Sequence, residues 1–334
     1  MPVLTVSRLC KRFNLEAGFF ARFGRFVNAV NDISFSIEKN ESYGLVGESG
    51  CGKTTTARML VRMYEADFGD ILYYQDDKPV AVSALGGEAL RRYREKVRYV
   101  FQDPAKSLNP RMSVYEVLVS GCRKPLKQRG INEKELREKA AAILEEVGLS
   151  ADDLEKRPSE FSGGQRQRIS IARALLMEPE VLICDEVVSA LDVSIQGQIL
   201  NLLLDIRKKR NMSFLFIAHD LKVACYFCDR IGVMYKGKLM EEAPAADLYK
   251  EALHPYTKLL FSSAAGITEE GIAEETHAEK ILPRTARTSA NEETLGNACS
   301  FAPRCPQAAE QCFKEHPALK EVKSGHSIRC FNCG

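Results

Sequence analysis

The stretch "VGESGCGKTTT", residues 46–56, joins a short apolar run to a predicted helix. Its Gly47, Gly52, Lys53 and Thr54 match the spacing G-x-x-x-x-G-K-[ST]. A glycine-rich turn between a strand and a helix lets backbone N–H groups surround phosphate oxygens, and the helix N-terminus adds unpaired donors. The stretch therefore predicts a loop that holds a nucleoside triphosphate; the alternative is a glycine-rich turn with an incidental lysine.

Each side chain of this phosphate loop has an expected task. Lys53 is expected to contact the β- and γ-phosphates, and the Thr54 hydroxyl is expected to ligate Mg²⁺. The residues predicted to line the nucleotide are Gly47, Ser49, Gly50, Cys51, Gly52, Lys53, Thr54 and Thr55.

A pair of carboxylates follows a second apolar run in "LICDEVVSALD", residues 182–192. A buried strand would deliver Asp185 to its carboxyl end, where Mg²⁺ is expected. Glu186 comes next, so it can face a water in line with the γ-phosphate, within hydrogen-bond reach of the proton it takes. The alternative is a solvated acidic turn, which the phosphate loop elsewhere in the chain makes the weaker interpretation.

Two adjacent glycines stand at the start of a predicted helix in "EFSGGQRQRISIARALLMEP". Ser162 and Gln165 have the spacing of a capping box. A capped helix does not explain Gly163 and Gly164, which lower helix propensity, whereas a ligand that approaches the backbone closely does. This second predicted anion site suggests that two subunits sandwich one nucleotide.

The remaining sequence predicts an α/β protein. Apolar runs alternate with amphipathic helices, which is typical of a largely parallel sheet. Strands are expected at 2–9, 28–38, 42–47, 97–104, 179–186, 213–220 and, as a strand–turn–strand, 230–243, with helices at 53–64 and 131–148.

Composition excludes several classes of protein. The chain of 334 residues has 47 Lys+Arg against 45 Asp+Glu, which leaves a formal net charge of +2. This balance gives no electrostatic footprint for nucleic acid, so no nucleic-acid partner is expected. The first residues, "MPVLTVSRLCKRF", lack the apolar core of a signal peptide. No apolar run approaches the roughly 18 residues of a membrane span, so a membrane role would require partner chains.

Taken together, these motifs resemble those of ATP-binding cassette (ABC) ATPases. "FSGGQ" is similar to the family's signature, "FQDP" to its Q-loop with Gln102, "SALD" to its D-loop, and "AHD" places His219 as the switch histidine. The order and spacing agree over about residues 3–250. One departure is Val187-Val188 after Glu186, where the family often has Pro and a small residue. Neither residue is a ligand.

The resemblance implies a fold and a set of roles. The fold is a P-loop NTPase cassette with a RecA-like parallel-sheet core, an antiparallel β subdomain and a helical subdomain at about 105–177. Glu186, His219 and Gln102 would be catalytic, and ATP and Mg²⁺ would be bound. The Mg²⁺ ligands would be Thr54, Gln102 and Asp185; the partner's ATP site would be completed by Ser162, Gly163, Gly164 and Gln165; and the D-loop would be Ser189, Ala190, Leu191 and Asp192.

Within that family, "FQDPAKSLNPRM", "SALDVSIQ" and "LHPYTKLL" resemble the ATPase subunits of oligopeptide/dipeptide importers, F-type in particular. The resemblance implies a D-type ATPase partner, two integral-membrane permeases, an extracytoplasmic solute-binding protein and a place on the cytoplasmic face of the membrane. Nickel chelates, haem or other solutes are alternative cargoes. A non-transport ABC ATPase and a metal-sensing regulator remain competing interpretations.

The sequence divides into three parts. An ABC domain is expected over 1–261 and a weakly packed connector over 262–298, which has no aromatic residue. A Cys-rich module follows over 299–334. Its Cys299, Cys305, Cys312 and Cys330 are spaced C-x5-C-x6-C-x17-C, without the two close pairs usual for zinc. With the family resemblance, this favours a structural [4Fe–4S] cluster over zinc, disulfides or free thiols.

The aromatic residue that stacks on adenine is predicted by position alone. Phe13, in "LCKRF", precedes the phosphate loop at a suitable place, and Phe23 or Phe26 in the following insertion are alternatives. Each phenylalanine has core packing as its other interpretation. The insertion "NLEAGFFARFGRF" is also a candidate for contact with a membrane surface.

Overall fold

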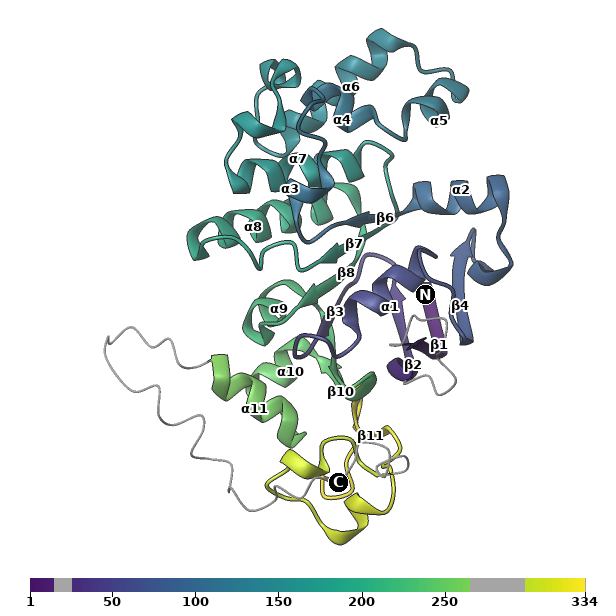
Figure 1. Cartoon of the computed structure of the whole chain (residues 1–334), viewed down its shortest axis with the longest axis vertical. Coiled ribbons are helices and arrows are strands. Elements are labelled where there is room, and N and C mark those ends of the chain that lie inside the picture. Colours follow the sequence, from purple (N-terminus) through teal and green to yellow (C-terminus); the bar gives the residue numbers. More distant parts are fainter. Residues whose placement is uncertain (15–25, 265–297, 334) are drawn as a thin grey trace, which may run out of the picture.

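The computed structural model describes residues 1–14, 26–264 and 298–333, which form two sheets with helices around the larger one (Figure 1). The smaller sheet has four strands in the order β2 (Phe26–Glu38), β1 (Pro2–Asn14), β4 (Phe68–Gln75) and β5 (Lys78–Ala81), and its paired strands are antiparallel. Its apolar side chains form a second core together with those of the first helix and of one face of the larger sheet.

The larger sheet has eight strands and provides the edge on which the predicted site lies. Its order is β11 (Lys320–Lys323), β12 (His326–Ile328), β10 (Lys238–Pro244), β9 (Arg230–Tyr235), β3 (Ser42–Val46), β8 (Ser213–Ala218), β7 (Val181–Asp185) and β6 (Val97–Val100). The run from β9 to β6 is parallel. The strands β3, β7 and β8 are buried along their whole length, as expected for a parallel sheet covered on both faces.

The described helices surround this sheet, and those from α4 to α7 gather at the end of the molecule opposite the C-terminal residues (Figure 1). Their bounds are α1 (Lys53–Leu60), α2 (Gly87–Lys96), α3 (Pro104–Ser107), α4 (Val114–Val119), α5 (Arg123–Gln128), α6 (Glu133–Glu146), α7 (Gly163–Leu175), α8 (Val193–Arg210), α9 (Leu221–Phe227), α10 (Ala245–Lys250) and α11 (Pro255–Ala264).

Several boundaries differ from the sequence prediction. The helix expected to reach Tyr64 ends at Leu60, because Arg62 has a positive φ of 55° that breaks the helical path. The strand expected to reach Pro104 ends at Val100. Helix α11 continues to Ala264, so the first residues of the predicted connector are helical, and residues 265–297 of it lie outside the described residues.

The C-terminal residues are joined to the main fold by sheet pairing and by core packing. Strand β12 pairs with β10, and β11 pairs with β12, so the last hairpin extends the larger sheet. Phe301, 1% exposed, belongs to the main apolar core. Sheet pairing and the burial of Phe301 therefore attach these residues to the main fold.

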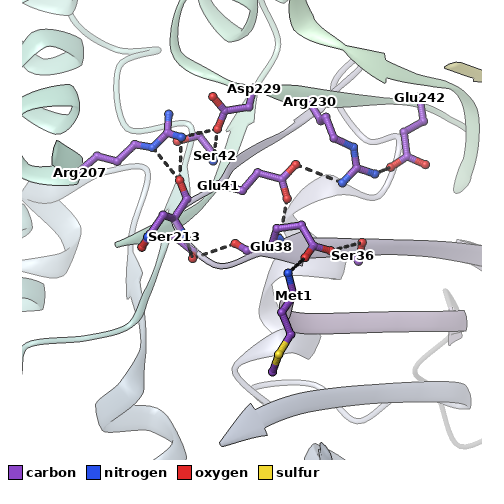
Figure 2. Close-up of polar contacts among 11 residues, drawn as sticks. Met1, Ser36, Glu38, Glu41, Ser42, Arg207, Ser213, Asp229, Arg230 and Glu242 are labelled. Carbon is purple, nitrogen blue, oxygen red and sulfur yellow. Dashed lines mark hydrogen bonds and ion pairs between the residues drawn. The ribbon is translucent and has the colours of Figure 1, made fainter. Parts of the chain in front are cut away.

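A network of charged groups fastens the smaller sheet to the larger one (Figure 2). Arg230 of β9 bridges Glu41, at 3.1 Å, and Glu242 of β10, at 2.6 Å. The Glu41 carboxylate also accepts a hydrogen bond of 2.6 Å from the backbone N–H of Glu38, at the end of β2. Because Glu41 is 7% exposed, loss of Arg230 would leave a buried carboxylate without its cation.

Candidate nucleotide-binding site

Parallel strands place the two predicted halves of the site side by side. Val46, the last residue of β3, is aligned with Ala218 of β8, and Asp185 of β7 is aligned with Ile217. Since the carboxyl ends of parallel strands meet at one edge of a sheet, the phosphate loop and the carboxylates emerge together. The spatial proximity that the sequence motifs predicted is present.

The phosphate loop has a backbone that only glycine accommodates at its close contacts. Gly52 has a φ of +111°, and a Cβ atom there would lie 2.1 Å from the carbonyl oxygen of Ala29. A Cβ atom on Gly47 would lie 2.2 Å from the carbonyl oxygen of Met234. Gly50, by contrast, is exposed and faces open space. The loop is thus held tightly on its protein side and free on its outer side.

Lys53 lies folded over the loop that precedes it. Its ammonium donates hydrogen bonds to the carbonyl oxygens of Gly47, at 2.7 Å, and Glu48, at 3.0 Å, and lies 3.9 Å from a Glu186 carboxylate oxygen. The side chain is 3% exposed, so this charge is solvated by the protein rather than by water. An ammonium held among carbonyl oxygens at the mouth of an anion-binding loop is suited to a phosphate.

Oxygen ligands of the kind that Mg²⁺ prefers are adjacent. The Thr54 hydroxyl donates a hydrogen bond of 3.0 Å to Asp185 Oδ1, and the Tyr99 hydroxyl hydrogen-bonds the other carboxylate oxygen. A hydroxyl and a carboxylate fit the oxygen-rich coordination of Mg²⁺. Gln102, the third predicted ligand, instead donates a hydrogen bond of 2.7 Å to Glu186 Oε2.

Glu186 has an unusual backbone that aims its carboxylate. Its φ is +49°, in the left-handed region that non-glycine residues seldom adopt, and its N–H donates to the carbonyl of Ile217 at 3.1 Å. Such strain costs about 1–3 kcal/mol and persists where the surroundings enforce it. His219, exposed after β8, lines the same small cavity as Glu186 and Ser189. Four predicted participants, Lys53, Gln102, Glu186 and His219, therefore lie around one place.

The remaining residues of the phosphate loop differ in exposure. Ser49 is exposed, whereas Cys51 is buried and Thr55 is half-buried in the first turn of α1. Burial raises the pKa of the Cys51 thiol. The thiol form is therefore favoured, and Cys51 contributes packing against Gly47 rather than a reactive sulfur.

The predicted signature residues lie apart from this cluster. Ser162 caps α7, accepting from the N–H of Gln165 at 3.3 Å, while the Gln165 side chain accepts from the N–H of Ser162 at 2.9 Å. Ser162, Gly163 and Gln165 are exposed, and a Cβ atom on Gly164 would lie 2.6 Å from the Ile195 side chain. Among the described residues, no hydrogen bond or ion pair joins this segment to the phosphate loop.

The D-loop lies next to the signature, also at the surface. Ser189 turns inward and donates to the carbonyl of Glu186 at 2.9 Å, whereas Ala190 and Asp192 are exposed. The side chain of Leu191 lies 3.7 Å from where a Cβ atom of Gly163 would stand. Val193, which follows, is 81% exposed although it is apolar.

Phe13 lies in the hairpin that reaches the phosphate loop. It pairs with Val27, two residues before the Ala29 carbonyl that contacts Gly52. Its ring meets Tyr64 edge-on at 5.4 Å between centroids. Phe26 is 63% exposed, and Phe23, with most of the insertion, lies outside the described residues.

The four cysteines of the C-terminal segment do not form a ready ligand set. Cys299 and Cys312 are buried and joined by a backbone hydrogen bond of 2.8 Å, while Cys305 and Cys330 are half-buried. Within residues 1–14, 26–264 and 298–333, no three His, Cys, Asp or Glu side chains are grouped to hold a metal ion. The thiolate chemistry suits a soft metal, but this arrangement does not yet fit one.

Sequence reasoning missed the groups that reach the site from afar. Tyr99, whose hydroxyl contacts Asp185, is not part of a recognisable motif. In the sequence, a tyrosine in a predicted strand cannot be told from an ordinary core aromatic residue. Arg304, 256 residues from Glu48, forms an ion pair with it that no local pattern indicates. No described helix is long and apolar enough to span a bilayer.

Comparison with known proteins agrees with this geometry. The sequence profile of the family described as "ABC transporter" matches residues 30–189. The solved structure of cbiO1 from Clostridium perfringens, part of an ABC transporter complex, aligns with a TM-score of 0.62 at 25% identity, covering 79% of this chain and 96% of that one. A dimeric post-hydrolysis structure of the ATP-binding cassette MJ0796, bound to ADP and Pi, aligns with a TM-score of 0.62 at 25% identity. The alignment covers 72% of this chain and 98% of that one. Fold and motifs together define an ABC-type ATPase, an ATP-hydrolysing enzyme.

The C-terminal region narrows the family further. A profile described as "Oligopeptide/dipeptide transporter, C-terminal region" matches residues 240–312. A putative peptide import ATP-binding protein of Brucella ovis is 41% identical over 98% of this chain and 97% of its own length. The oligopeptide transport ATP-binding protein AppF of Bacillus subtilis is 40% identical over 98% of this chain and 96% of its own length. The chain belongs to this family of transporter ATP-binding proteins, which confirms the resemblance drawn from its motifs.

Proposed function

We propose that the chain is the ATPase subunit of a peptide importer and that it works as one half of an ATP sandwich. The main observation behind this proposal is the cluster of Lys53, Thr54, Asp185 and Glu186 at one edge of the larger sheet. The match of the oligopeptide/dipeptide transporter region at residues 240–312 and the names of the relatives support peptides as cargo. Nickel chelates, haem or another solute remain the alternative cargoes.

The contacts support a role for most residues of the site. Lys53 binds the β- and γ-phosphates. Thr54 and Asp185 would hold Mg²⁺, which would neutralise phosphate charge when bound. Glu186 positions and deprotonates the attacking water, with Gln102 and His219 beside it. The Gln102 amide N–H donates to the Glu186 carboxylate, and its amide oxygen would be the atom that ligates Mg²⁺. Phe13 stacks on adenine.

Exposure of the signature supports a shared site. Ser162, Gly163, Gly164 and Gln165 would complete the ATP site of a second ABC subunit of the D type, and the D-loop would lie against that partner. Both ATPases would sit at the cytoplasmic face beneath two permeases supplied by a solute-binding protein. This assembly is inferred from the relatives' names and from the apolar exposed Val193.

A nucleotide titration and a transport assay test this proposal. Lys53→Ala should weaken MgATP binding by the full chain, because the phosphate charge loses its buried cation, whereas Lys39→Ala, which removes an exposed lysine paired with Asp77, should not. Co-expressed permeases should co-purify with the chain, and peptide uptake should require Lys53. Unchanged affinity in Lys53→Ala would refute the nucleotide site, and uptake of only a non-peptide solute would refute the cargo.

The cysteine cluster stays a hypothesis within this proposal. Four thiolates on Cys299, Cys305, Cys312 and Cys330 would need to move together to hold a [4Fe–4S] cluster, or zinc as the alternative. Anaerobic purification followed by iron and zinc analysis decides: about four iron atoms per chain support the cluster, and an iron-free protein removes it.

A further inference from the structure

Glu48 of the phosphate loop is bound by two residues from the C-terminal part of the chain. Its backbone N–H donates to the Tyr256 hydroxyl at 3.0 Å. Its carboxylate accepts two hydrogen bonds from the Arg304 guanidinium, both of 2.9 Å. Its carbonyl accepts from the Lys53 ammonium at 3.0 Å. The same residue therefore contacts the phosphate-binding lysine and two residues far along the chain.

Arg304 is itself held in place by aromatic rings. Its guanidinium carbon lies 5.6 Å from the ring centre of Tyr235 and 5.8 Å from that of Phe301. Phe301 packs against Tyr235 and Tyr256, with centroid distances of 5.3 and 5.4 Å. A planar guanidinium held beside two rings is oriented before it meets a carboxylate, and its two-pronged geometry fixes that carboxylate's direction.

The segment that presents Arg304 is a short turn between two cysteines. The N–H of Ala302 donates to the carbonyl of Cys299 at 3.0 Å, and that of Arg304 to the carbonyl of Phe301 at 2.9 Å. The N–H of Cys299 in turn bonds the carbonyl of Cys312 at 2.8 Å. The direction of Arg304 therefore depends on the order of the cysteine-bearing segment.

We infer that Arg304 is a positioning residue for the phosphate loop, through which the order of the cysteine-bearing segment, residues 298–313, is coupled to nucleotide binding. This inference rests on the nucleotide site proposed above. By fixing Glu48, Arg304 keeps the Glu48 carbonyl and the Lys53 ammonium where the loop's N–H groups can receive phosphate. A loop that is not held in place would lose conformational entropy when ATP binds, and this cost would lower the affinity for ATP.

The partial exposure of the pair separates this role from a purely stabilising one. The Arg304 and Glu48 side chains are 36% and 40% exposed. Exposed ion pairs contribute little to the free energy of unfolding. A variant that lacks the pair should therefore fold, and its defect should appear in nucleotide affinity.

A double-mutant cycle on the full chain tests the contact. Arg304→Gln and Glu48→Gln should each raise the Kd for MgATP by about fivefold, the low end of coupling between linked sites. The double variant should be no weaker than either single variant, because the two side chains act as one unit. Lys323→Ala is the matched control: it breaks another ion pair of the C-terminal residues, with Glu251 at 3.3 Å, and should leave the Kd unchanged.

Hydrogen exchange tests the coupling from the other side. Since coupling between two sites is reciprocal, MgATP should slow amide exchange in residues 298–313 of the wild-type chain and have less effect in Arg304→Gln. Equal Kd values in wild type and Arg304→Gln, additive losses in the double variant, or ATP protection that persists without Arg304 would each overturn the inference. If the wild-type chain does not bind MgATP, the proposed nucleotide site fails as well, which distinguishes the two.

Discussion

The phosphate-loop region and the signature region are both proposed to act on nucleotide, yet their surroundings in this chain are opposite. Lys53 and Asp185 are buried, and their polar atoms are paired within the chain. Ser162 and Gly163 are exposed; in the described part of the chain, Ser162 hydrogen-bonds within its own helix end and Gly163 lies beside Leu191 of the D-loop. A region satisfied internally can form in one chain, whereas an exposed one with glycines at a helix N-terminus is suited to a ligand brought by another chain.

The largest expected effect is on the internally satisfied side. Glu186→Gln keeps the size of the side chain but removes the base, so ATP should still bind while hydrolysis by the assembled transporter falls about 10²–10³-fold. Steady-state ATPase activity and MgATP titration measure the two quantities separately. Near-normal turnover would show that Glu186 is not the base, and the strain at its backbone would then need another explanation.

The second prediction tests the exposed signature region. Gly163→Ala has room in this chain, since its Cβ atom would stand 3.7 Å from Leu191, an ordinary contact. The chain should therefore fold and bind ATP normally, yet hydrolysis at a site shared with a partner should fall about 10²-fold if backbone and phosphate approach closely. ATPase activity of the purified complex measures this.

The neighbouring glycine provides a contrasting variant. Gly164→Ala places a Cβ atom 2.6 Å from Ile195, so it should lower the thermal stability of this chain even without a partner. If Gly163→Ala leaves hydrolysis of the complex unchanged, the signature does not contact a nucleotide.

The third prediction concerns pH and the segment that supports the phosphate loop. Burial lowers the pKa of His254 to about 4, and its Nδ1 accepts from the N–H of Tyr256, the residue that bonds Glu48. Between pH 6.5 and 4, His254 is protonated in the unfolded chain, where its pKa is near 6.5, but stays neutral in the folded chain. Its contribution to the free energy of unfolding should therefore be complete above pH 6.5. As the pH falls towards 4 the free energy of unfolding should decrease, by about 2 kcal/mol at pH 5.

Urea denaturation at pH 7 and pH 5 measures that difference. His254→Gln should reduce it, and the remainder should include His316, whose pKa burial also lowers to about 4. The same difference in wild type and His254→Gln would contradict the assignment. The signature region has no histidine, so its helix should show no such dependence.

The smallest expected effect compares two helix caps. Ser162→Ala and Asn132→Ala each remove the side-chain half of a capping box, and each should cost about 1 kcal/mol of unfolding free energy. Only Ser162→Ala should also lower ATPase activity of the complex, because only that cap faces the proposed shared site. If the two variants have equal stability and equal ATPase activity, Ser162 acts only as a helix cap and has no role in the shared site.

The sequence by itself determined the class of fold and the local chemistry of the site. Glycine at positions 47 and 52 is required by backbone approach, and the apolar runs before Lys53, Asp185 and His219 become strands of one parallel sheet. These features are encoded within a few residues of each other, so spacing and periodicity reveal them.

Tertiary structure alone decided which distant groups complete and support the site. The pairing of β10 with β12, the Tyr99 hydroxyl on Asp185 and the Arg304 guanidinium on Glu48 join residues far apart in the chain. No periodicity relates such residues, because their proximity comes from sheet order and core packing rather than from local propensity. The sequence therefore marks where phosphate binds, and the fold decides what holds the phosphate loop in place.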